Sequence, residues 1–89
     1  MLFMGVDTWT SENRNEVVKR MQEKGLMVPE GLKIINIWTD VTGGRNFVLF
    51  EADSPDKILA WVYTWSDIIK FEATPVMETE KVMQAIQGS

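Results

Sequence analysis

The stretch 36-NIWTDVTGGRNFVLFEAD-53 is typical of a β-hairpin. Two runs of strand-forming residues flank Gly43 and Gly44, which can adopt the positive φ of a tight turn without steric cost. The complete strands are predicted over LKIINIWT (32–39) and NFVLFEA (46–52). Asn36, Trp38 and Glu51 interrupt the apolar alternation, so one face of the hairpin is either a solvent-exposed surface or the lining of a site.

The segments on both sides of the hairpin predict the remaining elements. They are a strand over 2–9, a helix from a cap at Thr10 or Ser11 to Gly25, a helix over 54–67, a strand over 68–77 and a short C-terminal helix over 78–86. Ser54 as N-cap and Pro55 at the first helical position favour the second helix. Pro75 near the end of the fourth strand indicates a sheet edge or a bulge.

This order, βαββαβ with a tail helix, predicts one α+β domain over residues 1–89 with a ferredoxin-like fold. Its strands form a four-stranded antiparallel sheet. Right-handed crossovers place both helices on the same face of the sheet. The opposite face, called here the helix-free face, is left uncovered.

The hairpin register assigns residues to the two faces, because residues two apart share a face. With Trp38 opposite Phe47, Asn36 lies opposite Leu49 and Ile34 lies opposite Glu51. The other face of the hairpin is apolar and is predicted to meet the helices; it consists of Ile35, Ile37, Val48 and Phe50.

In the first strand, Met4 and Val6 match the helix-covered face. Phe3, Gly5, Asp7 and Trp9 are then predicted on the helix-free face, with Asp7 near Phe47 and Trp9 near Arg45. The predicted ligand-binding residues on this face are Asp7, Trp9, Asn36, Trp38, Arg45, Phe47 and Glu51. Large aromatic residues mixed with carboxylates are typical of a covered surface. We expect a second copy of the chain to cover it, giving a homodimeric α+β barrel.

The composition excludes several classes of function. The chain has no cysteine and no histidine, so disulfides, Cys or His metal sites and histidine acid–base catalysis are excluded. The net charge is −4 with scattered Lys and Arg, which disfavours nucleic acid and anionic membranes as partners. No apolar run is long enough to span a bilayer. We expect a cytoplasmic protein without metal or cofactor.

Two motifs, TDVTGGRNFVLFEAD and WSDIIKFEATPV, resemble the domain of unknown function 3303 family. The matching residues are Trp9, Gly43, Gly44, Arg45, Phe47, Glu51, Ala52, Asp53, Trp65, Ser66, Asp67, Phe71, Glu72, Pro75 and Val76. The resemblance covers nearly the whole chain. It implies small prokaryotic proteins with a ferredoxin-like fold in the dimeric α+β barrel group, and it implies no activity.

Several motifs have a structural interpretation beside a functional one. Asp7, Glu51 and Glu72 form either a carboxylate site or ordinary ion pairs with Lys33, Arg45 or Lys70, and we favour ion pairs. TGGR binds phosphate or is only a hairpin turn, and we favour the turn.

The aromatic residues and the WSD segment also have a structural and a functional interpretation. Trp61 and Trp65 are expected in the core, because they fall at helical spacing with Ile58 and Val62. Trp9 and Trp38 stack on a planar ligand or pack in a dimer, and the sequence favours neither. WSD at 65–67 is interpreted as a helix end whose Ser66 and Asp67 bond backbone groups, because a serine nucleophile would lack a histidine base.

Three functions remain compatible with the sequence. The first is a dimer that binds a small planar or aromatic molecule on the helix-free face. The second is a cofactor-independent monooxygenase or isomerase in the same pocket, with Asp7 or Glu51 as base; whether the protein is an enzyme at all stays open. The third is a structural or interaction module whose mixed face is consumed by dimerisation.

Overall fold

The computed structural model describes residues 1–88 and contains one four-stranded antiparallel sheet with the strand order β2-β3-β1-β4. The elements are β1 (Leu2–Thr8), α1 (Arg14–Lys24), β2 (Leu32–Thr39), β3 (Arg45–Ala52), α2 (Pro55–Trp65), β4 (Lys70–Pro75) and α3 (Thr79–Gln87). The predicted ferredoxin-like βαββαβ order with a tail helix is confirmed.

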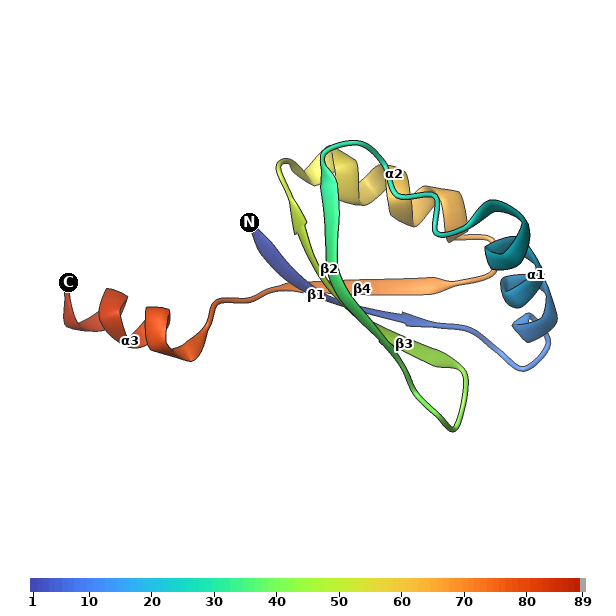
Figure 1. Ribbon diagram of the computed structural model, residues 1–89, viewed down its shortest axis with the longest axis horizontal. Helices are drawn as coiled ribbons and strands as arrows, with labels where there is room; N and C mark the ends of the chain where they lie inside the picture. Colours follow the sequence, from blue (N-terminus) through green and yellow to red (C-terminus); the bar gives the residue numbers. More distant parts are fainter. Residues whose placement is uncertain (89) are drawn as a thin grey trace.

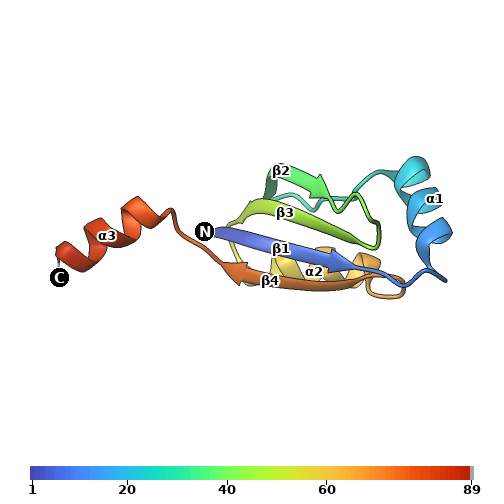
Figure 2. The ribbon, with the colours of Figure 1, turned by 90° about the horizontal axis from the view of Figure 1, so that it is seen from below.

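The helices are unevenly distributed around the sheet (Figure 1). α2 lies over one face of the sheet, α1 packs beside the C-terminal end of α2, and α3 projects away from the body. Figure 2 shows the opposite side, where the strands lie in front of α2 and no helix covers them. Within residues 1–88 no helix is long and apolar enough to cross a membrane. The cytoplasmic location stays a prediction.

The β2–β3 hairpin forms as its turn residues require. Gly43 and Gly44 have φ of 91° and 82°, in the region where a side chain would be strained. The Oδ1 of Asp40 accepts hydrogen bonds from the Thr42 backbone N at 2.9 Å and the Thr42 hydroxyl at 2.7 Å, which closes the turn. The predicted pairing of Trp38 with Phe47 is confirmed.

Farther from the turn, the predicted hairpin register is wrong. Ile34 pairs with Phe50 instead of Glu51, because β2 contains an irregularity between Ile34 and Asn36. A β-bulge adds one residue to a strand and disturbs the strict alternation of faces. The alternation predicted that Ile35 faces the core, and this prediction is wrong. Ile35 is 47% exposed.

The register of β1 also differs from the prediction, by one residue. Asp7 pairs with Asn46 rather than Phe47. A slip of one residue moves every side chain of a strand to the other face. Phe3, Gly5 and Asp7 therefore face the helices. Met4 and Val6 lie on the helix-free face, which is the reverse of the prediction.

Gly5 explains why β1 takes this orientation. A Cβ atom added to Gly5 would lie 2.7 Å from Cζ of Phe71 and 3.1 Å from Cε1 of Phe50. Both aromatic rings thus pack directly against the β1 backbone. Glycine in a strand is typical of such a close approach, and only this orientation of β1 provides the space.

The core lies between α2 and the sheet. Phe50, Val48 and Val17 are its most completely buried side chains. Trp61 and Trp65 are buried as predicted, and both indole N–H groups donate to the Leu26 carbonyl, at 2.9 and 3.1 Å. The two tryptophans therefore fix the loop after α1 as well as filling the core.

The helix and strand ends differ little from the predictions. α1 begins later than expected, with Asn13 at its N-cap in place of Thr10 or Ser11. Ser54 and Pro55 occupy the predicted N-cap and first helical position of α2. Pro75 ends β4, which is an edge strand as expected. The absence of a backbone N–H at Pro75 therefore costs no ladder hydrogen bond.

Candidate functional site

Asp7 is a buried carboxylic acid in an apolar environment between the sheet and the helices. Asp7 is 8% exposed, and its cross-strand partner Asn46 is 4% exposed. Asp7 lines a cavity of about 20 Å³, called here the Asp7 cavity. The other lining residues are Met21, Leu26, Ile37, Val48, Trp61, Val62, Trp65, Ile69 and Phe71. A cavity of this volume is large enough for one water molecule.

The environment of Asp7 changes its acidity. Burial raises the pKa of the Asp7 carboxyl from 3.8 to about 6, and hydrogen bonds from the Asp7 backbone and the Asn46 side chain lower it in part. Desolvation disfavours the charged form because an apolar environment cannot replace hydration. Asp7 can consequently exchange its proton near neutral pH.

Hydrogen-bonding capacity remains unused at this position. Within residues 1–88, Oδ1 of Asp7 and Oδ1 of Asn46 are buried and have no hydrogen-bond partner. The same holds for the indole Nε1 of Trp9. Leaving such groups unpaired costs about 1–3 kcal/mol each, so the site favours a molecule that supplies the missing partners. The carboxyl oxygen of Asp7 and the amide oxygen of Asn46 are both acceptors, so they favour a ligand with hydrogen-bond donors.

An open groove lies next to the Asp7 cavity. This Trp9 groove has a volume of about 600 Å³ and is formed by the end of β1, the end of α2 and the start of β4. Its lining residues are Thr8, Trp9, Thr10, Asn13, Val62, Ser66, Asp67, Ile68, Ile69, Lys70 and Phe71. Val62, Ile69 and Phe71 line both spaces, so three side chains form a shared wall.

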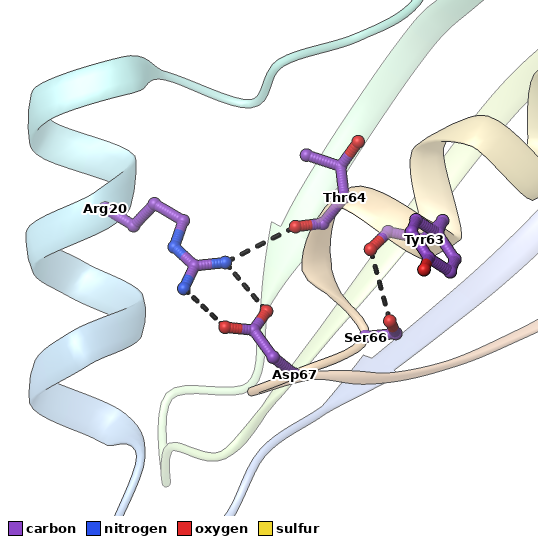
Figure 3. Close-up of polar contacts among 5 residues, drawn as sticks. All are labelled: Arg20, Tyr63, Thr64, Ser66 and Asp67. Carbon is purple, nitrogen blue, oxygen red and sulfur yellow. Dashed lines mark hydrogen bonds and ion pairs between the residues drawn. The ribbon is translucent and has the colours of Figure 1, made fainter.

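An ion pair holds the α2 side of the groove in place (Figure 3). Arg20 reaches from α1 and donates from both Nη atoms to the Asp67 carboxylate, at 2.9 and 2.7 Å, and to the Thr64 carbonyl at 3.3 Å. Its guanidinium also lies 5.4 Å from the centre of the Trp65 ring. Hydrogen bonding from Arg20 lowers the pKa of Asp67. The WSD segment is thus a helix end, as predicted.

The two polar residues of the WSD segment differ in how they bond. Ser66 donates to the Tyr63 carbonyl at 3.1 Å, so it bonds a backbone group as expected. Asp67 was expected to do the same, but its carboxylate binds the Arg20 side chain instead. A bidentate Arg–carboxylate pair fixes both the distance and the orientation of its partners. It therefore links α1 to the end of α2.

The sequence-predicted site residues do not form one cavity. Asp7 lies on the helix side of the sheet, and Trp9 follows β1 and packs against the core. The other five residues belong to the hairpin, and all of them lie on the helix-free face: Asn36, Trp38, Arg45, Phe47 and Glu51. The prediction that Asp7 shares a pocket with them is wrong, because β1 pairs one residue out of the assumed register.

Arg45 has a structural role in the hairpin. Its Nη2 lies 3.2 Å from the Asp40 carboxylate, and its guanidinium lies 5.1 Å from the centre of the Phe47 ring. The backbone N of Gly43 donates to the Asp40 carbonyl at 2.8 Å. Because Arg45 and the turn already have these partners, the geometry favours the hairpin interpretation of TGGR over a phosphate site.

The three carboxylates considered for a cation site are separated. Glu72 forms an ion pair with Lys70 at 3.3 Å, and Glu51 is the strand partner of Lys33. Both are on the face opposite to Asp7. Among residues 1–88, no group of three His, Cys, Asp or Glu side chains is arranged to hold a metal ion.

Sequence reasoning missed Asn46 and the shared wall. Asn46 could have been found, because it shares the alternation of Val48 and Phe50 and so lies on the helix side. Phe71 could have been inferred from Gly5, since an interior strand glycine indicates close packing. Ile69 belongs to the loop between α2 and β4, where no periodic pattern exists.

Three comparisons place this geometry among known proteins. The family described as "Domain of unknown function (DUF3303)" matches residues 1–89. The crystal structure of an uncharacterized NIPSNAP domain protein from Burkholderia xenovorans matches with a TM-score of 0.50 and 13% identity, over 88% of this chain and 96% of that chain. At this identity the likeness shows the fold alone.

A second solved structure is also similar. It is the crystal structure of a protein named as a "putative antibiotic biosynthesis monooxygenase" from Deinococcus radiodurans, with a TM-score of 0.47 and 10% identity, over 86% of this chain and 92% of that chain. No curated protein matches the sequence. The function is therefore argued from the site itself.

Proposed function

This chain belongs to the domain of unknown function 3303 family, and we propose that it binds a small apolar molecule carrying a hydrogen-bond donor. The donor group enters the Asp7 cavity, and the apolar body occupies the Trp9 groove. The observation that carries the proposal is the buried Asp7 carboxyl, whose Oδ1 has no partner among the described residues although apolar side chains surround it. Few polar groups in an apolar pocket are typical of ligand sites.

The size of the two spaces decides how such a ligand is held. The Asp7 cavity holds no more than a water-sized group, whereas the groove accommodates a ring system. A ligand that reaches both must displace side chains of the shared wall, Val62, Ile69 or Phe71. Side-chain rotation at a binding site is common even when the backbone stays fixed. We therefore place the ligand across this wall.

The ligand class follows from the unpaired atoms. Asp7 is largely ionised at pH 7, because its pKa is about 6. Together with Oδ1 of Asn46 it offers acceptors only, so it selects an N–H or O–H group. Hydrogen bonds to charged groups contribute about 1.5–3 kcal/mol, which corresponds to at least a tenfold preference over an analogue that lacks the donor.

Indole and 1-methylindole test this proposal, since the two differ in one N–H donor. We expect indole to shift the backbone amide resonances of Asp7, Asn46 and Ile69 in an NMR titration, and to bind at least tenfold more tightly than 1-methylindole. Asp7→Leu should abolish this preference. The matched control is Glu51→Leu, which removes a carboxylate from the other face and should preserve it.

The result that would overturn the proposal is equally specific. Indole-dependent shifts centred on Trp38 and Leu49, which Glu51→Leu abolishes and Asp7→Leu leaves unchanged, would place the site on the helix-free face. Equal affinity for indole and 1-methylindole would remove Asp7 as the anchor.

A second candidate function, proton transfer in an isomerase, is favoured by the same pKa. An Asp7 carboxylate could take a proton from a carbon next to a carbonyl and return it to the same or another carbon, so no oxidant is required. Exchange of the C2 protons of 1-indanone with D₂O, followed by NMR, tests this. We expect the exchange rate to rise through pH 6 and to vanish in Asp7→Leu. Exchange that Asp7→Leu leaves unchanged would exclude this function.

The protein is also proposed to act as a homodimer through the helix-free face. That face carries the apolar side chains of Met4, Val6, Trp38, Phe47 and Leu49. Trp38 is 47% exposed, which is unusual for so large an apolar side chain. A contiguous apolar patch on a small protein marks an interaction surface, and a two-fold related copy supplies a complementary one.

A further inference from the structure

The C-terminal helix α3 is amphipathic and projects beyond the end of the sheet. Val82, Met83 and Ile86 fall on one side, at the i, i+1 and i+4 spacing of an apolar stripe, whereas Glu80 and Gln84 lie elsewhere on the helix. No α3 residue that the structure describes is buried, and Met83 is 50% exposed. Figures 1 and 2 both show α3 beyond the end of the sheet.

A helix of this length needs a surface to pack on. α3 has nine residues, and isolated helices shorter than about 12–15 residues are marginal in water. Its stability therefore depends on burying the apolar stripe. None of its residues that the structure describes is fully buried in this position, so another molecule is the natural source of the contact.

The size and shape of the chain indicate how much surface is available for such a contact. The accessible surface is 6346 Å², whereas a compact protein of 10.2 kDa exposes about 5300 Å². The excess, about 1000 Å², exceeds the ~800 Å² that one partner buries in a standard interface. The radius of gyration is 14.9 Å, against about 12 Å for a compact chain of this length.

The attachment of α3 places it beside the proposed dimer face. The backbone N of Val76 donates to the Leu2 carbonyl at 2.9 Å, so the chain leaves the sheet at the start of β1. Only Met77 and Glu78 separate this point from α3. Packed sheets lie about 10 Å apart, and two extended residues span about 7 Å, so a small change at this linker brings α3 against a facing subunit.

We propose that α3 is an exchanged arm, which packs its apolar stripe on the sheet of a second copy of this chain. The proposal rests on the dimer proposed above and goes beyond it, because it assigns part of the interface to residues 77–87. By two-fold symmetry each subunit both gives and receives an arm. The arm covers apolar side chains at the rim of the partner's helix-free face.

Four proteins test the arm by sedimentation over a concentration series. They are the full chain, a chain ending at Val76, the double variant Val82→Glu/Met83→Glu and the control Gln84→Glu/Gln87→Glu. The double variant and the control add the same charge to α3, but only the former disrupts the stripe. We expect the full chain and the control to dimerise with equal affinity, and the other two at least tenfold more weakly. Near-ultraviolet circular dichroism verifies that each subunit is folded.

Hydrogen exchange adds a local readout. The α3 amides should be protected in the dimer of the full chain and should lose protection on dilution to monomer. A chain ending at Val76 that dimerises as tightly as the full chain would overturn the arm but leave the sheet dimer intact. A full chain that stays monomeric would remove both proposals, and α3 amides protected in a monomer would show an arm folded onto its own subunit.

Discussion

At the residue scale, Asp7 acts against the stability of the fold it belongs to. Its carboxyl has a pKa of about 6 in the folded protein and an ordinary value of 3.8 when exposed, because burial penalises the charge. The folded state therefore binds the proton more tightly than the unfolded state. Stability contributed by the protonated form is present below pH 4 and is lost as the pH rises to about 6.

Replacing Asp7 by Asn removes the loss of stability with rising pH, since the amide stays neutral. We predict that Asp7→Asn and the original protein unfold at similar urea concentrations at pH 4, and that the variant becomes more stable by about 2–3 kcal/mol above pH 6. Urea unfolding at a series of pH values measures the difference. A difference that is constant from pH 4 to 7 would contradict the buried, uncompensated charge.

Asp67→Asn is a control for which the pH dependence of stability should have the opposite sign. Hydrogen bonding from Arg20 lowers the pKa of Asp67, so its carboxylate contributes stability above the ordinary pKa, and this contribution is lost as the pH falls. Asp67→Asn should therefore be destabilising at pH 7 and should have little effect at the acid end. The two Asp→Asn substitutions should therefore change the stability in opposite directions at pH 7, because Asp67 is paired with Arg20 and Asp7 is buried among apolar side chains.

At the element scale, α2 connects the core to the proposed site. Trp61 lines the Asp7 cavity, packs against Phe50 with ring centres 5.8 Å apart, and donates its N–H to the Leu26 carbonyl. One element therefore supplies both stability and the cavity wall. A variant that disturbs the wall will also affect folding.

We predict that Trp61→Ala lowers the free energy of unfolding by about 3–5 kcal/mol, because it leaves a cavity and an under-used carbonyl. The control on the same helix is Leu59→Ala, whose side chain is exposed and should change stability by less than about 0.5 kcal/mol. Urea unfolding followed by circular dichroism compares them. An unchanged midpoint for Trp61→Ala with loss of indole binding would show that Trp61 serves the ligand alone.

The elements also show where sequence reasoning succeeds and where it fails. The hairpin was predictable because the glycine turn fixes the register of Trp38 with Phe47. β1 was not, because LFMGVDT is apolar on both faces and offers no turn to fix its pairing. Matching Met4 and Val6 to the helix-covered face then placed Asp7 on the wrong side.

The candidate site was predictable in part. Trp61 and Trp65 were correctly predicted as core residues, and Asp7 and Trp9, which were predicted to bind a ligand, line the cavity and the groove. Their grouping into one pocket depended on register, which period-two patterning cannot supply when both faces are apolar. The bulge at Ile35 was not predictable, because its neighbour Asn36 is a poor strand former but one such residue does not indicate a bulge.

At the scale of the whole molecule, the two sides of the sheet have different proposed roles. The helix side holds the cavity with Asp7, and the helix-free face holds Trp38 and the proposed dimer interface. This separation predicts that the two functions can be disrupted independently. A charged substitution on the helix-free face should abolish dimerisation and leave indole binding unchanged.

Trp38→Glu tests the whole-molecule prediction. At micromolar concentration we expect the original protein to sediment with twice the chain mass and Trp38→Glu to sediment as a monomer, because a charge cannot be buried unpaired in an apolar interface. The control is Leu59→Glu, which adds the same charge to an exposed apolar position on α2 and should leave the dimer intact. Dissociation by Leu59→Glu alone would move the interface to the helix side.

The most direct test of Asp7 as the ligand anchor is an NMR titration of its side-chain carboxyl carbon against pH. We predict a midpoint near pH 6 in the free protein. Saturating indole should lower this midpoint, because its N–H stabilises the ionised carboxylate, and 1-methylindole should leave it unchanged. A midpoint at the ordinary value of 3.8, or one that indole does not move, would contradict the proposed site.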